Sequence, residues 1–188
     1  MGVSRSLKIS VTALFAAFAS ILEILPLDLR FPLYEKVTLD PTGIPLTLAL
    51  YMFGIDVASV ATIVTGLVIS LPRPPFKGPN PIGAFFKSLA ELSTLLGIYA
   101  SRRLWKSKLS TLLWSLVTGI TTRATVMTIV CITLLPLFYG VPQYIVFKIA
   151  LIIAVFNLVQ GTLNIVIGYL LYEPIKKRVY SSLYSSLR

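Results

Sequence analysis

Long uncharged apolar runs are the feature of this 188-residue sequence that most limits its fold. A helix that crosses a bilayer needs about 20 mostly apolar residues, and runs of this kind recur along the whole chain. Only 13% of the residues are charged, about half the share usual in soluble domains. The sequence therefore predicts an all-α integral membrane protein that crosses the cell membrane several times.

The run at 44–71 decides how many spans are predicted. One helix of this length would rise about 42 Å across a hydrocarbon core of about 30 Å, and it would hold Asp56 near mid-membrane, where a carboxylate is costly. Two short helices that turn at Gly54 to Asp56 avoid both problems. We therefore predict one domain over residues 1–188, with spans at about 8–26, 44–54, 56–71, 81–101, 110–135 and 145–172.

The segment at 27–43, between the first two spans, alternates charged and apolar residues, which favours an extended, structured extracellular loop. Asp40 and Pro41 predict the start of the second helix, with Asp40 as N-cap and Pro41 as the first helical residue.

Positive charges orient such a chain, because cytoplasmic loops are rich in Lys and Arg. Six spans with cytoplasmic N- and C-termini leave ten basic residues inside (Arg5, Lys8, Arg102, Arg103, Lys106, Lys108, Lys176, Lys177, Arg178 and Arg188) and four outside (Arg30, Lys36, Arg73 and Lys77). Five spans with an outside N-terminus give the same counts. The six-span prediction therefore rests on the length of the run at 44–71 and on the cost of placing Asp56 near mid-membrane. The net charge of +10 is then explained by cytoplasmic loops that lie beside anionic lipid. It does not indicate a nucleic-acid-binding surface.

Several classes of chemistry are excluded by composition. The chain has no histidine and one cysteine, Cys131, which removes imidazole catalysis, disulfides and most transition-metal sites. P-loop, HExxH and GxSxG motifs are absent. We expect no enzyme activity, no metal and no catalytic cofactor, so active transport would need a partner.

Ionisable residues inside spans are candidate functional residues. Lys87 and Glu91 lie four residues apart, so they either pair on one helix face or bind a ligand. Arg123 lies deep in its span and must face protein or a cavity. Glu23, Asp56 and Lys148 lie near span ends, where a structural role is the simpler interpretation.

Polar residues of the last span fall on one helix face. Asn157, Gln160, Gly161 and Asn164 have spacings of 3, 1 and 3. This face either hydrogen-bonds neighbouring helices or forms a polar wall for a neutral or zwitterionic ligand. Both interpretations stay open for Asn157 and Gln160, and packing is favoured for Asn164.

The first span carries small residues at helical spacing, among them Ala13 and Ala17, which would let another helix approach closely. VTLDPTGIP at 37–45, LLPLFYG at 134–140 and FNLVQGTLNIVIGYLLYEPI at 156–175 follow in order. With this arrangement the whole chain resembles the substrate-binding S components of energy-coupling-factor (ECF) vitamin transporters, and most closely their riboflavin-type branch.

The resemblance implies a six-helix subunit that binds a vitamin near its outer face and delivers it with a coupling subunit and two ATPases. It implies that Ala13 and Ala17 contact the coupling subunit and that Leu39, Asp40, Asn157 and Gln160 lie at the binding site. Gln160 stands where lysine is usual, Gly43 replaces an acidic residue, and Cys131 or a neighbour takes the place of an asparagine.

We therefore expect substrate binding by Asn157, Gln160, Lys87, Glu91, Arg123, Leu39 and Asp40, with riboflavin as the favoured ligand. Aromatic residues near the outer span ends are candidates to stack on a flat ring or to anchor the protein at the interface (Phe31, Tyr34, Phe85, Phe86, Tyr139 and Tyr144). The alternatives are another vitamin or small metabolite, a membrane-embedded transferase, or an assembly protein.

Overall fold

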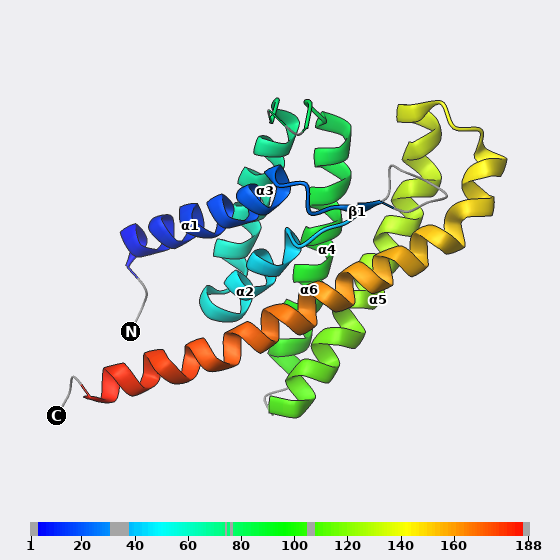
Figure 1. Ribbon diagram of the computed structural model, residues 1–188. Helices are drawn as coiled ribbons and strands as arrows, with labels where there is room; N and C mark the ends of the chain where they lie inside the picture. Colours follow the sequence, from blue (N-terminus) through cyan, green and yellow to red (C-terminus); the bar gives the residue numbers. More distant parts are fainter. Residues whose placement is uncertain (1–3, 31–37, 74, 76, 105–107, 186–188) are drawn as a thin grey trace.

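The computed structural model describes residues 4–30, 38–73, 75, 77–104 and 108–185. This part of the chain holds six helices, and the all-α prediction is confirmed (Figure 1). The helices are α1 (Arg5–Ile24), α2 (Gly43–Phe53), α3 (Ile55–Ser70), α4 (Pro81–Leu104), α5 (Lys108–Tyr139) and α6 (Gln143–Ser185). Among them α1, α4, α5 and α6 are long and apolar enough to cross a membrane, whereas α2 and α3 have 11 and 16 residues.

Local sequence signals set the ends of α1. The Ser4 hydroxyl caps its first turn by accepting a hydrogen bond from the Leu7 N–H at 3.3 Å. The helix stops where Leu25 becomes extended, as expected of a residue that precedes a proline. After it, strand β1 (Leu29–Arg30) pairs antiparallel with β2 (Thr38–Leu39), so both described ends of the predicted extended loop form a strand pair.

The predicted break in the run at 44–71 is confirmed. Gly54 separates α2 from α3 with φ of 96°, a conformation that costs a residue without Cβ very little. The predicted start of α2 is wrong by two residues. The helix begins at Gly43, after Thr42, because the Asp40 carboxylate accepts a hydrogen bond from the Thr42 N–H at 2.9 Å and closes a turn before the helix.

The last helices are longer than the predicted spans. Helix α5 runs on through Pro136 and ends before Gly140, which has φ of 62°. Helix α6 continues to Ser185, thirteen residues past the predicted span end at 172, because a helix can extend beyond the bilayer where its residues become charged. Span length and helix length are therefore different quantities here.

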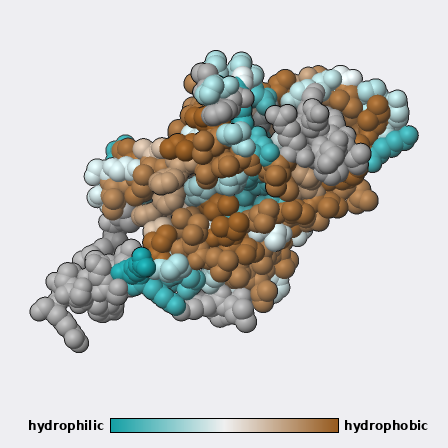
Figure 2. Space-filling model, viewed as in Figure 1, coloured by the Kyte–Doolittle hydropathy of each residue, from teal (hydrophilic) through white to brown (hydrophobic). Residues whose placement is uncertain are grey.

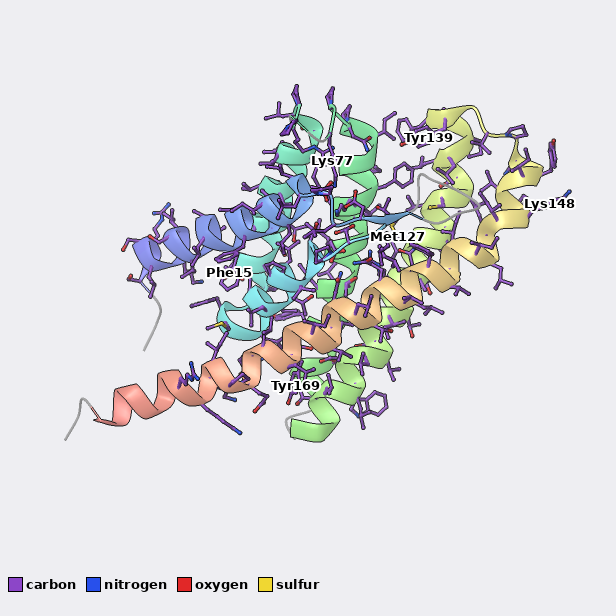
Figure 3. All side chains as sticks on the ribbon, viewed as in Figure 1. Phe15, Lys77, Met127, Tyr139, Lys148 and Tyr169 are labelled. Atoms are coloured by element: carbon purple, nitrogen blue, oxygen red, sulfur yellow. The ribbon has the colours of Figure 1, made fainter. Side chains whose placement is uncertain are left out.

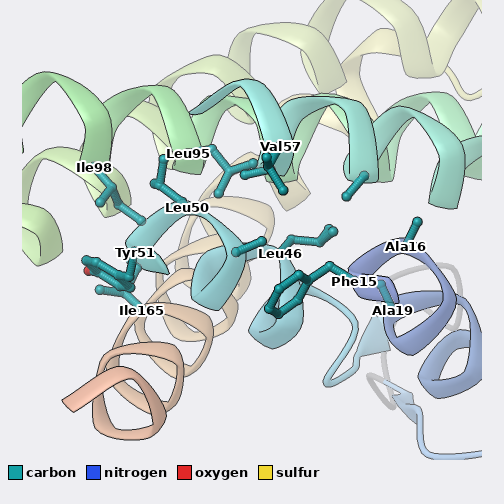
Figure 4. Packing of buried hydrophobic residues seen from close by; sticks show 13 residues of the cluster. Phe15, Ala16, Ala19, Leu46, Leu50, Tyr51, Val57, Leu95, Ile98 and Ile165 are labelled. Atoms are coloured by element: carbon teal, nitrogen blue, oxygen red, sulfur yellow. The ribbon is translucent and has the colours of Figure 1, made fainter. Parts of the chain in front are cut away.

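The main core joins α1, α2, α3, α4 and α6 (Figure 4). Alanines on three helices, Ala19, Ala49 and Ala58, are fully buried and allow the close helix approach typical of membrane proteins. A second cluster joins α4, α5 and α6, with Met127, Cys131, Leu135 and Ile153 among its members.

The outer surface is largely apolar. Figure 2 shows hydrophobic residues over most of the visible face, while hydrophilic residues gather at the helix connections and toward the C-terminal end of α6. Exposed side chains such as Leu151, Leu137 and Leu170, which are 74%, 73% and 61% accessible, fit lipid contact.

Candidate functional site

A cavity of about 650 Å³ lies between the β2 end of the first loop, the connection after α3, and helices α4, α5 and α6. Lys77, Met127 and Tyr139, labelled in Figure 3, are among the residues that line it. Its volume falls within the range of about 300–1,000 Å³ that small-molecule sites occupy.

Glu23, at the end of α1, is buried and accepts hydrogen bonds from four side chains. One carboxylate oxygen accepts from Arg73 at 2.5 Å and from Lys77 at 3.4 Å. The other accepts from Lys87 and, at 3.2 Å, from the Thr42 hydroxyl. We call these five residues the Glu23 cluster. It joins α1, the connection after α3, α4 and the start of α2 at one point.

Two further carboxylates complete the charges on this side of the cavity. Asp28 pairs with Lys77 at 2.7 Å, and Asp40 pairs with Lys87 at 2.9 Å. Burial disfavours the charged form of Asp40, but Lys87 and the hydrogen bonds from Thr42 outweigh this effect, so the pKa of this carboxyl lies below its usual value. Asp40 is therefore ionised at neutral pH.

A second ion pair lies deeper in the bundle. Arg123 donates to Glu91 at 2.8 Å, and its Nε donates to Asn157 at 3.2 Å. The Asn164 amide donates to both oxygens of Glu91, each at 3.1 Å. Since a buried charge is tolerated only when it is paired and hydrogen-bonded, these contacts explain how Arg123 and Glu91 are accommodated inside the bundle.

Gln160 joins α6 to the first loop. Its Oε1 accepts from the Asp40 N–H at 3.1 Å, and its Nε2 donates to the Asp40 carbonyl at 2.6 Å and to Asn164 at 3.0 Å. Its amide thus pairs with the backbone of a single loop residue through both groups.

Another part of the cavity lining is apolar and partly aromatic. Phe86 and Tyr139 lie with ring centroids 6.5 Å apart and planes 30° from parallel. Met127, Cys131, Leu135 and Ile153 extend this part of the lining. A cavity lined by both aromatic and hydrogen-bonding side chains fits a flat organic ring that carries polar groups.

The structure brings together most residues that the sequence singled out. Leu39 is the one predicted binding residue that does not line the cavity. The other six do: Asn157, Gln160, Lys87, Glu91, Arg123 and Asp40. Lys87 and Glu91 do not pair with each other, because Lys87 bonds Glu23 and Asp40 while Glu91 bonds Arg123. The polar face of α6 points inward as predicted, with Gln160, Gly161 and Asn164 buried.

Other predicted residues lie elsewhere. Ala13 and Ala17 are exposed on α1, as a partner-binding face requires. Phe86 and Tyr139 line the cavity, whereas Phe85 and Tyr144 are exposed. Phe31 and Tyr34 fall outside the described residues.

Four cavity residues were missed or misjudged from sequence. The sequence predicts a structural role for Glu23 near a span end, places Arg73 and Lys77 only among the outside charges, and does not single out Asp28 within the loop at 27–43. The available signal was the balance of basic residues at 73 and 77 against acidic ones at 23 and 28, all near the predicted outer ends. No group of three or more His, Cys, Asp or Glu side chains among the described residues could hold a metal ion.

Comparison with known proteins places this chain in a family. No protein-family model matches it. It shares its fold with a solved S component of a bacterial ECF transporter, at a TM-score of 0.79 and 24% identity over 94% of this chain and 99% of that one. It is 31% identical over 185 residues to the riboflavin transporter RibU of Staphylococcus aureus (strain TCH60). The matched region covers 92% of this chain and 92% of that protein. Because this similarity extends over nearly the whole of both chains, the protein is a membrane protein that belongs to the RibU transporter family.

Proposed function

We propose that this chain is the substrate-binding S component of an ECF importer for riboflavin. In this proposal six membrane spans leave both termini in the cytoplasm, and the vitamin enters the cavity from the outer face of the cell membrane. A coupling subunit and two ATPases complete the importer, while this chain hydrolyses no ATP itself. The relative of known name, a riboflavin transporter, supports the choice of vitamin.

The observation that carries the proposal is a cavity lined by both aromatic and hydrogen-bonding side chains. Phe86 and Tyr139 suit the flat apolar face of an isoalloxazine ring, and Asn157 lines the same cavity. Among the contacts of the described residues, one N–H of Asn157 is used on the Ile153 carbonyl and its oxygen accepts from Arg123. Its second N–H is left for a ligand carbonyl.

The charges that line the cavity favour a neutral ligand. Four carboxylates (Glu23, Asp28, Asp40 and Glu91) stand against four cations (Arg73, Lys77, Lys87 and Arg123). Each has an opposite partner within 4.0 Å. A ligand that brought its own charge would have to break such a pair or remain unpaired at low dielectric, which is costly. Riboflavin carries no net charge at neutral pH, unlike its phosphate ester.

The other function classes find less support. A membrane-embedded transferase would need a convergent acid–base pair, and Lys87 and Glu91, the one pair that the sequence suggested, bind different partners. Another vitamin remains an outcome of the binding experiment.

Ligand binding tests the proposal directly. Protein purified in detergent should quench riboflavin fluorescence on titration and carry a flavin absorption spectrum when isolated from riboflavin-fed cells. We expect riboflavin to bind more tightly than its phosphate ester. Asn157→Ala should weaken binding about tenfold, the cost of about one hydrogen bond. Thr162→Ala should have no effect, because the Thr162 hydroxyl bonds its own helix at the Leu158 carbonyl. Absence of riboflavin binding at micromolar concentration would refute the choice of vitamin.

A further inference from the structure

Gln160 has the contacts of a residue that holds the protein together at the cavity and not those of a ligand-binding group. A side-chain amide offers two N–H donors. Both are used here, one on the Asp40 carbonyl at 2.6 Å and one on Asn164 at 3.0 Å. The amide oxygen accepts from the Asp40 N–H at 3.1 Å. The side chain is also 4% exposed, so it has no N–H to give a ligand.

The paired backbone belongs to a segment that borders the cavity. Residues Thr38–Thr42, which we call the Asp40 segment, include two cavity-lining residues, Thr38 and Asp40. Gln160 pairs with both backbone groups of Asp40, as a neighbouring strand would. The segment is thereby fixed to α6, a helix 120 residues further along the chain.

Lys87, on α4, contacts the side chain of the same residue. Its ammonium lies 2.9 Å from the Asp40 carboxylate, and it also donates to the Thr42 hydroxyl at 3.1 Å. The Asp40 segment is thus tied to α6 through its backbone and to α4 through side chains. Only the contact with α6 depends on Gln160. A substitution of Gln160 therefore removes that contact and leaves the Lys87 contacts with α4 in place.

We propose that Gln160 is a positioning residue that keeps the Asp40 segment closed over the cavity and thereby sets how fast the ligand enters and leaves. This inference rests on the proposed function, in which the cavity holds a vitamin. Loss of the tie opens the segment more often, which speeds both association and dissociation. Loss of a ligand contact would speed dissociation alone.

Hydrogen exchange without ligand tests the tie independently of any vitamin. Gln160→Met keeps the volume of the side chain but removes its hydrogen-bonding groups. In the purified, ligand-free protein, exchange of the peptide that covers residues 38–44 should become about tenfold faster, as expected for the loss of about one net hydrogen bond. Thr162→Ala, two residues further along α6, should exchange as the wild type does.

Gln160→Glu is the second variant, for the case in which Gln160→Met does not purify as one species. Its carboxylate keeps an acceptor for the Asp40 N–H but has no N–H for the Asp40 carbonyl, so we expect the same faster exchange. Unchanged exchange in a folded Gln160 variant would overturn the proposal.

Stopped-flow riboflavin fluorescence then gives the rate constants. We expect the association and dissociation rate constants of Gln160→Met both to rise, and a rise in dissociation alone would assign Gln160 to ligand contact and overturn the proposal. If the wild type binds no riboflavin, the proposed function fails, while the exchange experiment still decides the role of Gln160.

Discussion

Gly43 is the residue on which close packing beneath the cavity most depends. It begins α2 at the point where that helix meets Glu91 and Asn164. A Cβ built at this position overlaps the Asn164 amide and the Glu91 carboxylate. Any larger residue would therefore displace the groups that surround the buried Arg123.

Gly43→Ala should destabilise the protein by about 1–3 kcal/mol, the usual cost of an overpacked core. Thermal unfolding of the purified protein in detergent would measure the loss as a lower Tm. Gly78→Ala is the matched control, because a Cβ at Gly78 meets no atom within 4 Å. Equal Tm values for the two variants would show that the Glu91–Asn164 contact yields without cost.

At the residue scale, the sequence predicted which residues line the cavity better than it predicted which charged residues pair with each other. The rule that ionisable residues within spans are functional candidates selected Lys87, Glu91 and Arg123, and all three line the cavity. Their partners could not be predicted, because spacing along one helix says nothing of which charges other helices bring closer. Glu23 was underestimated for the same reason, since three of its partners come from residues 50 or more positions away.

At the scale of elements, the Glu23 cluster fixes the end of α1 to the rest of the bundle. Its carboxylate receives Arg73 and Lys77 from the connection after α3 and Lys87 from α4. Lys77 also donates to the Glu23 carbonyl at 2.6 Å. These contacts therefore join this helix end to the connection after α3, beside the cavity.

Glu23→Gln should destabilise the fold strongly, because three cations would share two carboxylates in a buried site. Loss of one partner from a buried ion pair costs about 3–5 kcal/mol, and a clear fall in Tm would measure it. Asp56→Asn makes the same chemical change at an exposed pair with Lys8, whose side chains are 67% and 43% accessible. That control should cost less than about 0.5 kcal/mol, and a similar loss in both variants would contradict the role of the Glu23 cluster.

Helix boundaries could be predicted from the sequence where a local signal was strong. The Gly54 break was predicted because one long helix would have buried Asp56, and the structure has this break. The start of α2 was misplaced because Asp40 closes a turn that continues into the helix only after Thr42. The extent of α6 was underestimated because hydropathy detects the apolar part of a helix and not its polar continuation.

At the scale of the whole molecule, α1 presents two different faces. Phe15, Ala16 and Ala19 are buried in the core, while Ala13 and Ala17 are exposed. Small residues on an exposed helix face allow another helix to approach closely within a membrane. In the proposed importer this face meets the coupling subunit, and the cavity lies at the C-terminal end of α1, beside Glu23.

Binding and coupling should therefore be separable by substitution. Ala13→Trp places a large ring on the exposed face of α1, so it should impair vitamin uptake by the assembled importer while riboflavin affinity in the isolated chain stays unchanged. Leu151→Trp, at a 74% exposed position on α6, is the control that should leave both intact. Uptake measured in cells and fluorescence titration of the purified variants give the two readings. If Ala13→Trp lost riboflavin binding, α1 would act on the cavity itself, and a coupling role for this face would have to be abandoned.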